Sequence, residues 1–190
     1  MDILFQVIIG VGRAAACGFR AFVPLFAMSL AGIGGLMEFS SGFEWIGTYP
    51  ALIVFGIATI VEIVAYFVPY VDNALNAISL PFSIVAGVII VASVITDVEP
   101  VLRWSLALIA GGGVATGTGL ISNAIHIAST LSTGGAANPA VSTVETGATG
   151  IMAALSIILP VVSLVVIVLI IFFIVRYLRR KKVKPQLRRA

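Results

Sequence analysis

Long apolar segments alternate with short polar stretches along the chain. The apolar segments cover residues 3–37, 50–68, 73–95, 103–129 and 151–177. About 20 apolar residues in a helix cross the ~30 Å hydrocarbon layer of a membrane, and each segment reaches or approaches that length. The pattern predicts an all-α, polytopic transmembrane helical bundle with five or six spans.

Several of these spans are predicted to be broken or kinked. A straight helix over residues 3–37 would be ~50 Å long, which exceeds the membrane thickness, and Gly18 and Pro24 interrupt it. Pro81 and Pro160 lie inside later segments. A proline there removes a backbone N–H and clashes with the preceding turn, so it bends the helix.

Local signals also predict where helices begin. Pro50 suits the first position of a helix. Asp72 suits the N-cap position of a helix that starts at Asn73, because its side chain can accept a backbone hydrogen bond.

The stretch over residues 129–150 is rich in Ser, Thr, Gly and Asn and predicts an outer loop. Within it, Asn138 followed by Pro139 is typical of a helix start. A short or re-entrant sixth segment over residues 138–150 is therefore an alternative to five spans. The two interpretations place the N-terminus on opposite sides of the membrane.

Composition supports the membrane assignment. Hydrophobic residues make up 60% of the 190-residue chain and charged residues only 10%, whereas roughly 25% of a soluble domain is charged. The mean hydropathy is +1.17. A protein of this composition has too little polar surface for water, so the bilayer is its expected solvent.

The basic residues are unevenly placed. Of 11 Lys and Arg residues, 8 lie between Arg176 and Arg189. Cytoplasmic segments carry such an excess, which predicts a transmembrane domain over residues 1–178 and a cytoplasmic basic tail over residues 179–190. The tail is expected to rest on anionic lipid headgroups and not to bind nucleic acid.

The residues that support common enzyme chemistry are scarce. The chain has one cysteine, Cys17, and one histidine, His126, so a disulfide framework or a Cys-based metal cage is excluded. We interpret Cys17 as a small packing residue and His126 as a packed or interfacial residue rather than a ligand. No catalytic triad or phosphate-binding loop is visible, and we expect no enzymatic activity, no cofactor and no metal.

Glu62 is the most informative polar residue, because it lies inside an apolar segment. A charged side chain costs a few kcal/mol there. Thr59 and Tyr66 share its helix face. One interpretation is a site for a proton, a cation or a polar solute; the other is a structural ion pair or an interfacial position.

Arg13 and Arg20 are seven residues apart and lie on one helix face. They are candidates to bind an anionic group or to pair with Glu62 and Glu145; alternatively, they reach toward an interface. The helix that starts at Asn138 has a positive end that favours an anion or a water chain, unless it is an ordinary helix start in a loop.

Two small-residue stretches, residues 12–19 and 113–120, have similar patterns of Gly and Ala. Transporters often contain two such halves in inverted topology. The competing interpretation is that small residues accumulate wherever membrane helices pack closely.

Three separated motifs resemble one family of small, mostly bacterial membrane proteins, the domain of unknown function 4126. They are GFRAFVPL at residues 18–25, VEIV at 61–64 with VDNALN at 71–76, and STGGAANPAVS at 132–142. The resemblance implies an inner or plasma membrane location but no established activity. It also implies the signature positions Arg20, Pro24, Glu62, Asp72, Asn73, Asn138 and Pro139.

Two hypotheses for function follow. The first is a small secondary transporter or channel for a small polar or ionic solute, with Glu62, Arg13, Arg20, Asn138 and Glu145 as candidate site residues. The second is a protein that binds lipid or a protein partner and transports nothing. The short chain also makes a homo-oligomer an expectation.

Overall fold

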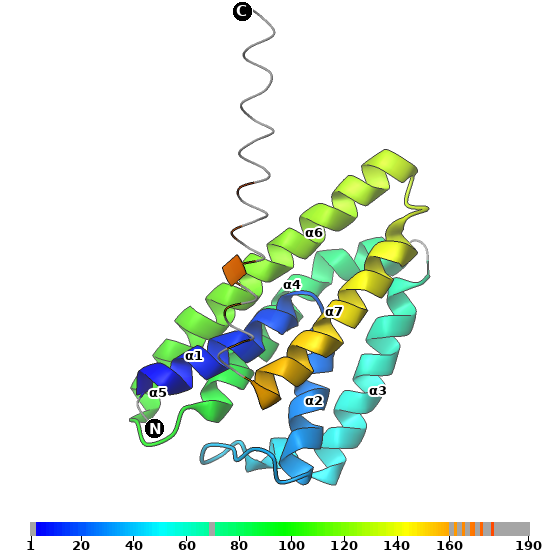
Figure 1. The fold of residues 1–190 in the computed structure, drawn as a ribbon. Helices are drawn as coiled ribbons and strands as arrows, with labels where there is room; N and C mark the ends of the chain where they lie inside the picture. The colour runs from blue at the N-terminus through cyan, green and yellow to red at the C-terminus, as the bar shows by residue number, and fades with distance from the viewer. Residues whose placement is uncertain are drawn as a thin grey trace, which may run out of the picture.

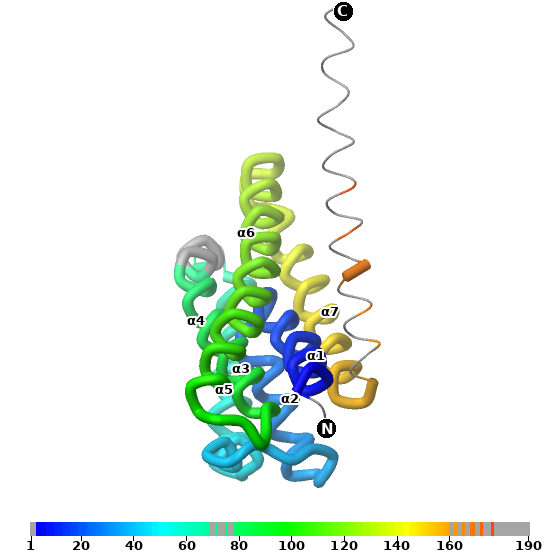
Figure 2. Tube along the Cα trace, turned by 90° about the vertical axis from the view of Figure 1, so that its left-hand side faces the viewer, coloured from blue at the N-terminus to red at the C-terminus, as the bar shows by residue number. Residues whose placement is uncertain are grey.

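The computed structural model describes residues 3–68 and 71–159, with the backbone alone at 72–74 and 76–77, and positions 162, 165, 168, 169, 172 and 176. The described chain is helical and contains no strand, which confirms the predicted all-α helical bundle (Figures 1 and 2). The elements are α1 Ile3–Ala14, the 3-10 turn η1 Ala15–Gly18, α2 Phe22–Ile33, the 3-10 turn η2 Glu44–Gly47, α3 Tyr49–Tyr66, α4 Val71–Val94, α5 Pro100–Leu106, the π-helical segment η3 Ala107–Gly112, α6 Gly113–Thr133 and α7 Asn138–Ile158.

The first apolar segment is a broken helix, as predicted. The helical path of α1 tightens into η1 and ends at Gly18, and α2 begins at Phe22. Pro24 lies in the first turn of α2, where its missing N–H costs no intrahelical hydrogen bond. The break therefore falls at residues 19–21 and places Arg20 between two helix ends.

The next two helices also follow the sequence prediction closely. Helix α3 has Pro50 in its first turn, and the hydroxyl of Thr48 accepts a hydrogen bond from Ala51 N at the N-cap. Helix α4 begins at Val71 and contains Pro81. The side chains of Asp72 and Asn73 lie outside the described residues, so the predicted cap stays a prediction.

Helices α5 and α6 form one continuous helix of 34 residues through the π-helical segment η3. Helix α4 crosses close to this segment. A Cβ atom added to Gly87 would lie 2.7 Å from Gly111 O and 2.7 Å from the Cβ of Ala115. The absence of a side chain at Gly87 is what allows the two backbones to approach this closely.

The predicted loop over residues 129–150 is wrong. Helix α6 continues to Thr133, Gly134 and Gly135 turn the chain with positive φ, and α7 starts at Asn138. Helix α7 then runs without interruption to Ile158, so 138–150 is neither a loop nor a separate short segment. Residue 151 is the middle of a helix, and most of the predicted span over residues 151–177 lies outside the described residues.

Helix α7 starts where the sequence predicts, but the Asn138 side chain does not cap it as expected. Asn138 is the first residue of the helix and Pro139 follows it in the first turn. The side chain of Asn138 donates to Thr130 Oγ1, 3.0 Å away on α6, and no side chain caps α7 at Ala137. The Asn138 amide therefore joins the two helices near their connecting turn.

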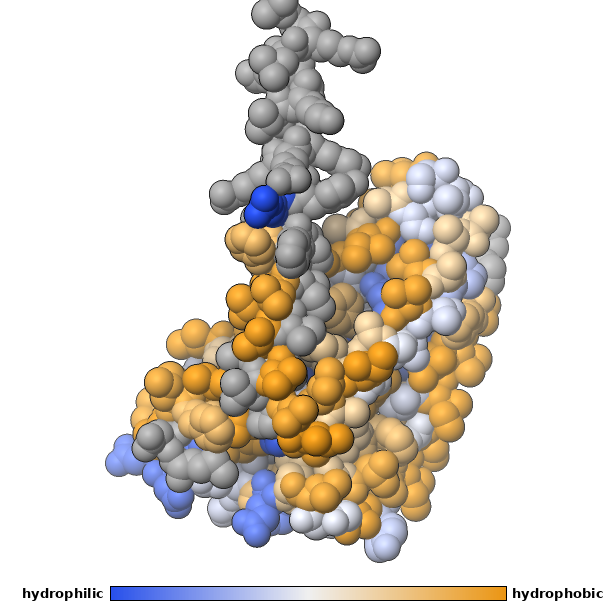
Figure 3. Space-filling view, in the orientation of Figure 1, coloured by the Kyte–Doolittle hydropathy of each residue, from blue (hydrophilic) through white to orange (hydrophobic). Residues whose placement is uncertain are grey.

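Polar residues face inward in the two C-terminal helices. The buried stripe of α7 includes Ser142, Glu145 and Thr149, whereas Val144 and Ile151 are exposed. In α6, His126 is buried and Leu131 is exposed. Apolar side chains cover most of the face drawn in Figure 3. This arrangement reverses that of a soluble helix and suits contact with lipid.

Among the described residues, three helices are long and apolar enough to cross a membrane: α3, the α5–α6 helix and α7. Shorter apolar helices cover Ile3–Gly18, Phe22–Ile33 and Ile78–Val94. The number of spans stays a prediction.

The two small-residue stretches pack against each other. A Cβ atom on Gly18 would lie 2.5 Å from Gly119 N and 2.6 Å from Thr118 Cβ. The need for close packing explains why both stretches are rich in small residues. An inverted repeat is a separate property of the chain and stays a prediction.

Candidate functional site

Arg20 occupies the centre of a buried polar cluster at the break between η1 and α2. The whole residue is 1% exposed. Its Nη1 donates to Phe19 O at 2.9 Å, its Nη2 donates to Ser142 O at 3.3 Å, and its Nε donates to Thr146 Oγ1 at 3.2 Å. The guanidinium thereby connects the broken backbone to α7.

Glu145 is the charge partner of Arg20. Its Oε2 lies 3.2 Å from Arg20 Nη1, and the two side chains are 7% and 0% exposed. The Glu145 carboxylate also accepts a 2.7 Å hydrogen bond from Ser122 Oγ and lies 2.9 Å from His126 Nε2. One carboxylate thus meets a guanidinium, a hydroxyl and an imidazole, which satisfies a charge that is costly to bury alone.

An aromatic ring covers the cluster from the α3 side. Arg20 Cζ lies 3.7 Å from the centre of the Tyr66 ring, which is a cation–π contact. The rings of Tyr66 and His126 have centres 5.8 Å apart. Tyr66 is the last residue of α3, so the cluster draws on α3, the break, α6 and α7.

Glu62 holds the other side of the break. Its Oε1 accepts the N–H of Ala21 at 2.8 Å, and its Oε2 accepts the N–H of Phe22 at 3.1 Å. The first N–H groups of a helix have no partner within that helix and carry a partial positive charge. A carboxylate from α3 therefore caps α2 immediately beside Arg20.

Glu62 and Tyr66 also line a cavity of about 390 Å³ between α2, α3 and α4. Ser79 contributes a hydroxyl, and the other lining residues, such as Phe22 and Ile78, are apolar. The cavity brings a ligand-sized space to one side of the polar cluster.

The structure brings three of the predicted site residues together and separates two. Arg20, Glu62 and Glu145 surround the break. Arg13 points elsewhere and donates from Nε to Ser156 O at 3.2 Å, while Asn138 contacts Thr130 near the α6–α7 turn. The pairing of Glu145 with an arginine is as expected from the sequence for Arg20, but Arg13 forms no ion pair with any described residue.

Three members of the cluster are not predicted as site residues from the sequence: Ser122, His126 and Tyr66. His126 is expected from the sequence to be a packed or interfacial residue; it is buried and contacts Glu145. The signal for Ser122 and His126 was their helical spacing. These two residues lie on one face of α6, and Ser142 and Glu145 lie on the face of α7 that meets it. That pairing becomes visible only once residues 138–150 are taken as helix.

The chemistry available at this site is proton exchange and anion binding. His126 Nε2 lies 2.9 Å from Glu145 Oε2, and this direct contact gives a proton a short path between the two side chains. Arg20 offers a guanidinium suited to a carboxylate or a phosphate. Among the described residues, no three His, Cys, Asp or Glu side chains lie together as a metal site would require.

These features define a helical membrane protein: apolar outer faces, three helices of spanning length, and buried charges between them. The chain belongs to the family described as domain of unknown function DUF4126, whose sequence profile matches residues 7–180. This confirms the family inferred from the three motifs. No curated protein and no solved structure matches the chain.

Proposed function

We propose that this protein is a small secondary transporter or channel for a small polar or ionic solute, and that the Arg20–Glu145–His126 cluster is its central site. The observation that carries the proposal is the burial of these ionisable groups between helices with apolar outer faces. Ionisable residues are rare in such surroundings and commonly mark ion or substrate pathways.

In this proposal an anionic solute competes with the Glu145 carboxylate for Arg20, and a proton on Glu145 favours binding of the solute. Protonation of Glu145, with His126 as the neighbouring donor, weakens its attraction for Arg20. The released guanidinium then binds the anionic group of the solute, which enters through the cavity beside Glu62 and Tyr66. When the proton leaves Glu145 for His126 or for water, the Arg20–Glu145 pair forms again and the solute is released.

The wider setting is also part of the proposal. The protein would cross a bacterial inner or plasma membrane several times, with its basic tail on the cytoplasmic side near anionic lipid headgroups.

A second candidate function is that the cluster only locks the helices and the protein binds lipid or a protein partner. The contacts that Arg20 and Glu145 already make with neighbouring helices support this candidate.

Proteoliposomes that contain a pH-sensitive dye test the first candidate. A panel of small carboxylates, phosphate, amino acids and inorganic ions would be added outside, and proton movement would be recorded. We expect at least one solute to cause proton uptake that Glu145→Gln abolishes and Glu99→Gln preserves. Glu99 is exposed in the α4–α5 loop, so it provides the same chemical change away from the cluster.

The outcome that favours the second candidate is also defined. If no solute on the panel causes proton or solute movement, or if Glu145→Gln transports at the wild-type rate, the transport proposal is wrong. A large loss of stability in Glu145→Gln together with silent vesicles would then support a structural lock.

A further inference from the structure

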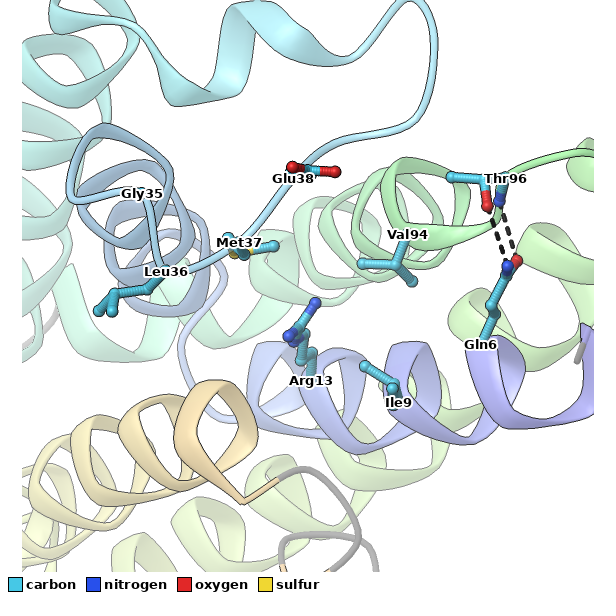
Figure 4. A pocket seen from close by; sticks show the side chains of 9 residues that line it. All are labelled: Gln6, Ile9, Arg13, Gly35, Leu36, Met37, Glu38, Val94 and Thr96. Atoms are coloured by element: carbon cyan, nitrogen blue, oxygen red, sulfur yellow. Dashed lines mark hydrogen bonds between the residues drawn. The ribbon is translucent and has the colours of Figure 1, made fainter. Parts of the chain in front are cut away.

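A second cavity lies beside α1, and no residue of the Arg20 cluster lines it. Its volume is about 470 Å³, within the range of small-molecule sites. Residues of α1, the chain after α2 and the end of α4 form its walls (Figure 4). The proposed transport site uses none of the side chains that line it.

Arg13 is the buried charge of this cavity. It is 7% exposed, and its one hydrogen bond to the described residues runs from Nε to Ser156 O. Figure 4 shows the guanidinium end directed into the cavity toward the chain after α2. A guanidinium has five N–H donors, so the terminal nitrogens are available to an anionic group that enters the space.

Glu38 supplies the opposite charge. It lies in the polar stretch after α2, is exposed, and lines the same cavity. In Figure 4 its carboxylate lies across the open space from Arg13, and no ion pair joins the two residues. A purely anionic ligand would be repelled by Glu38, and a purely cationic ligand by Arg13.

The wall between α1 and α4 is held in place by a paired contact. Gln6 Nε2 donates to Thr96 Oγ1 at 2.9 Å, and Thr96 N donates to Gln6 Oε1 at 2.9 Å. Ile9 and Val94 add apolar surface next to this pair. The cavity is therefore formed before a ligand arrives, which reduces the entropy lost on binding.

We propose that this cavity binds a small zwitterion, with an anionic group at Arg13 and a protonated amine at Glu38. The apolar wall favours a ligand with a short hydrocarbon part. Free amino acids and the headgroup of phosphatidylethanolamine share this chemistry. The proposal concerns equilibrium binding at a separate cavity, so it stands or falls independently of transport through the Arg20 cluster.

Isothermal titration calorimetry on the detergent-purified protein tests the proposal. The probes are leucine, its deaminated analogue 4-methylpentanoate, its decarboxylated analogue 3-methylbutylamine, and glycerophosphoethanolamine. We expect leucine or glycerophosphoethanolamine to bind about tenfold or more tightly than either singly charged analogue, because each charge adds a charge-assisted hydrogen bond. Binding by leucine indicates a free amino acid, and binding by glycerophosphoethanolamine alone indicates a lipid headgroup.

Single variants assign each end of the ligand. Arg13→Gln should remove the preference for the zwitterion over the amine, and Glu38→Gln should remove the preference over the carboxylate. Glu99→Gln is the matched control for Glu38→Gln, because Glu99 is exposed and does not line the cavity, and it should bind as the wild type does.

Glu38 is exposed, so its variant tests the proposal even if Arg13→Gln does not fold. Equal binding of the zwitterion and both analogues by the wild type would overturn the proposal. An undiminished preference in Glu38→Gln would also overturn it.

Discussion

Arg20 and Glu145 are 125 residues apart in the sequence, and Nη1 of the arginine lies 3.2 Å from Oε2 of the glutamate. The contact joins the break in the first helical segment to the buried face of α7. It also explains the inward polar face of α7, because a lipid-facing position for Glu145 would separate the two opposite charges.

A double-mutant cycle measures this contact. Arg20→Gln and Glu145→Gln each leave one buried charge without its partner, and each should lower the free energy of unfolding by about 3–5 kcal/mol. The double variant removes both charges and should lose less than the sum of the two single variants. Unfolding by sodium dodecyl sulfate in mixed micelles provides the measurement, and additive losses would show that the two residues do not interact.

Glu62→Gln tests the cap on α2. The amide retains one acceptor oxygen in place of two, so one of the N–H groups of Ala21 and Phe22 loses its partner. Hydrogen–deuterium exchange at the break should become faster, and stability should fall by about 1–3 kcal/mol. The rest of the bundle should keep its protection.

The matched control for Glu62→Gln is Glu44→Gln. Glu44 accepts a hydrogen bond from Gly42 N in an exposed loop at 2.8 Å, so its replacement should not affect exchange at Ala21. Unchanged exchange at Ala21 and Phe22 in Glu62→Gln would contradict the capping role.

Gly18→Ala tests the close crossing of η1 and α6. The added methyl group would lie 2.5 Å from Gly119 N, so the helices must separate, at a cost of about 1–3 kcal/mol. Gly117→Ala is the control, because a Cβ atom there meets no neighbouring atom within 4 Å. Alanine is also a better helix former than glycine, so this control should be neutral or slightly more stable in thermal unfolding. Equal destabilisation by both variants would count against the crossing.

The fold was largely predictable because apolar length and local breakers determine it. The apolar run from Ile3 was too long for one span, and the break fell between Gly18 and Pro24. Prolines in the first turn marked the starts of α3 and α7. These signals are local, so a single sequence reveals them.

The site was less predictable because its contacts join distant segments. Residues 129–150 contain many Ser, Thr and Gly residues, which predicted a loop and hid the helix that carries Glu145. A helix of the same polar composition is suited to a membrane protein when its polar face is buried against other helices and its apolar face contacts lipid. Nothing local indicated that Glu62 would cap α2 or that Tyr66 would stack on Arg20, since both contacts depend on how α3 packs.

The separation of Arg13 from Arg20 has a similar origin. On an ideal helix, two side chains seven residues apart lie on one face. The sequence therefore predicts that Arg13 and Arg20 lie together. In the structure the helix tightens into the 3-10 turn η1 and ends at Gly18. The helical register that relates Arg13 to position 20 is therefore lost before Arg20. The two guanidiniums consequently belong to different sites.

Water access to the Arg20 cluster is the most direct test of the central claim, since a transport site must open to both sides of the membrane. The probe is Ser142→Cys, at a position 0% exposed, in a Cys17→Ala background reconstituted in vesicles. A membrane-impermeant thiol reagent should label it from either side, more slowly than Ser132→Cys at the exposed end of α6. Labelling from neither side, or from one side only, while Ser132→Cys reacts fully would contradict the account.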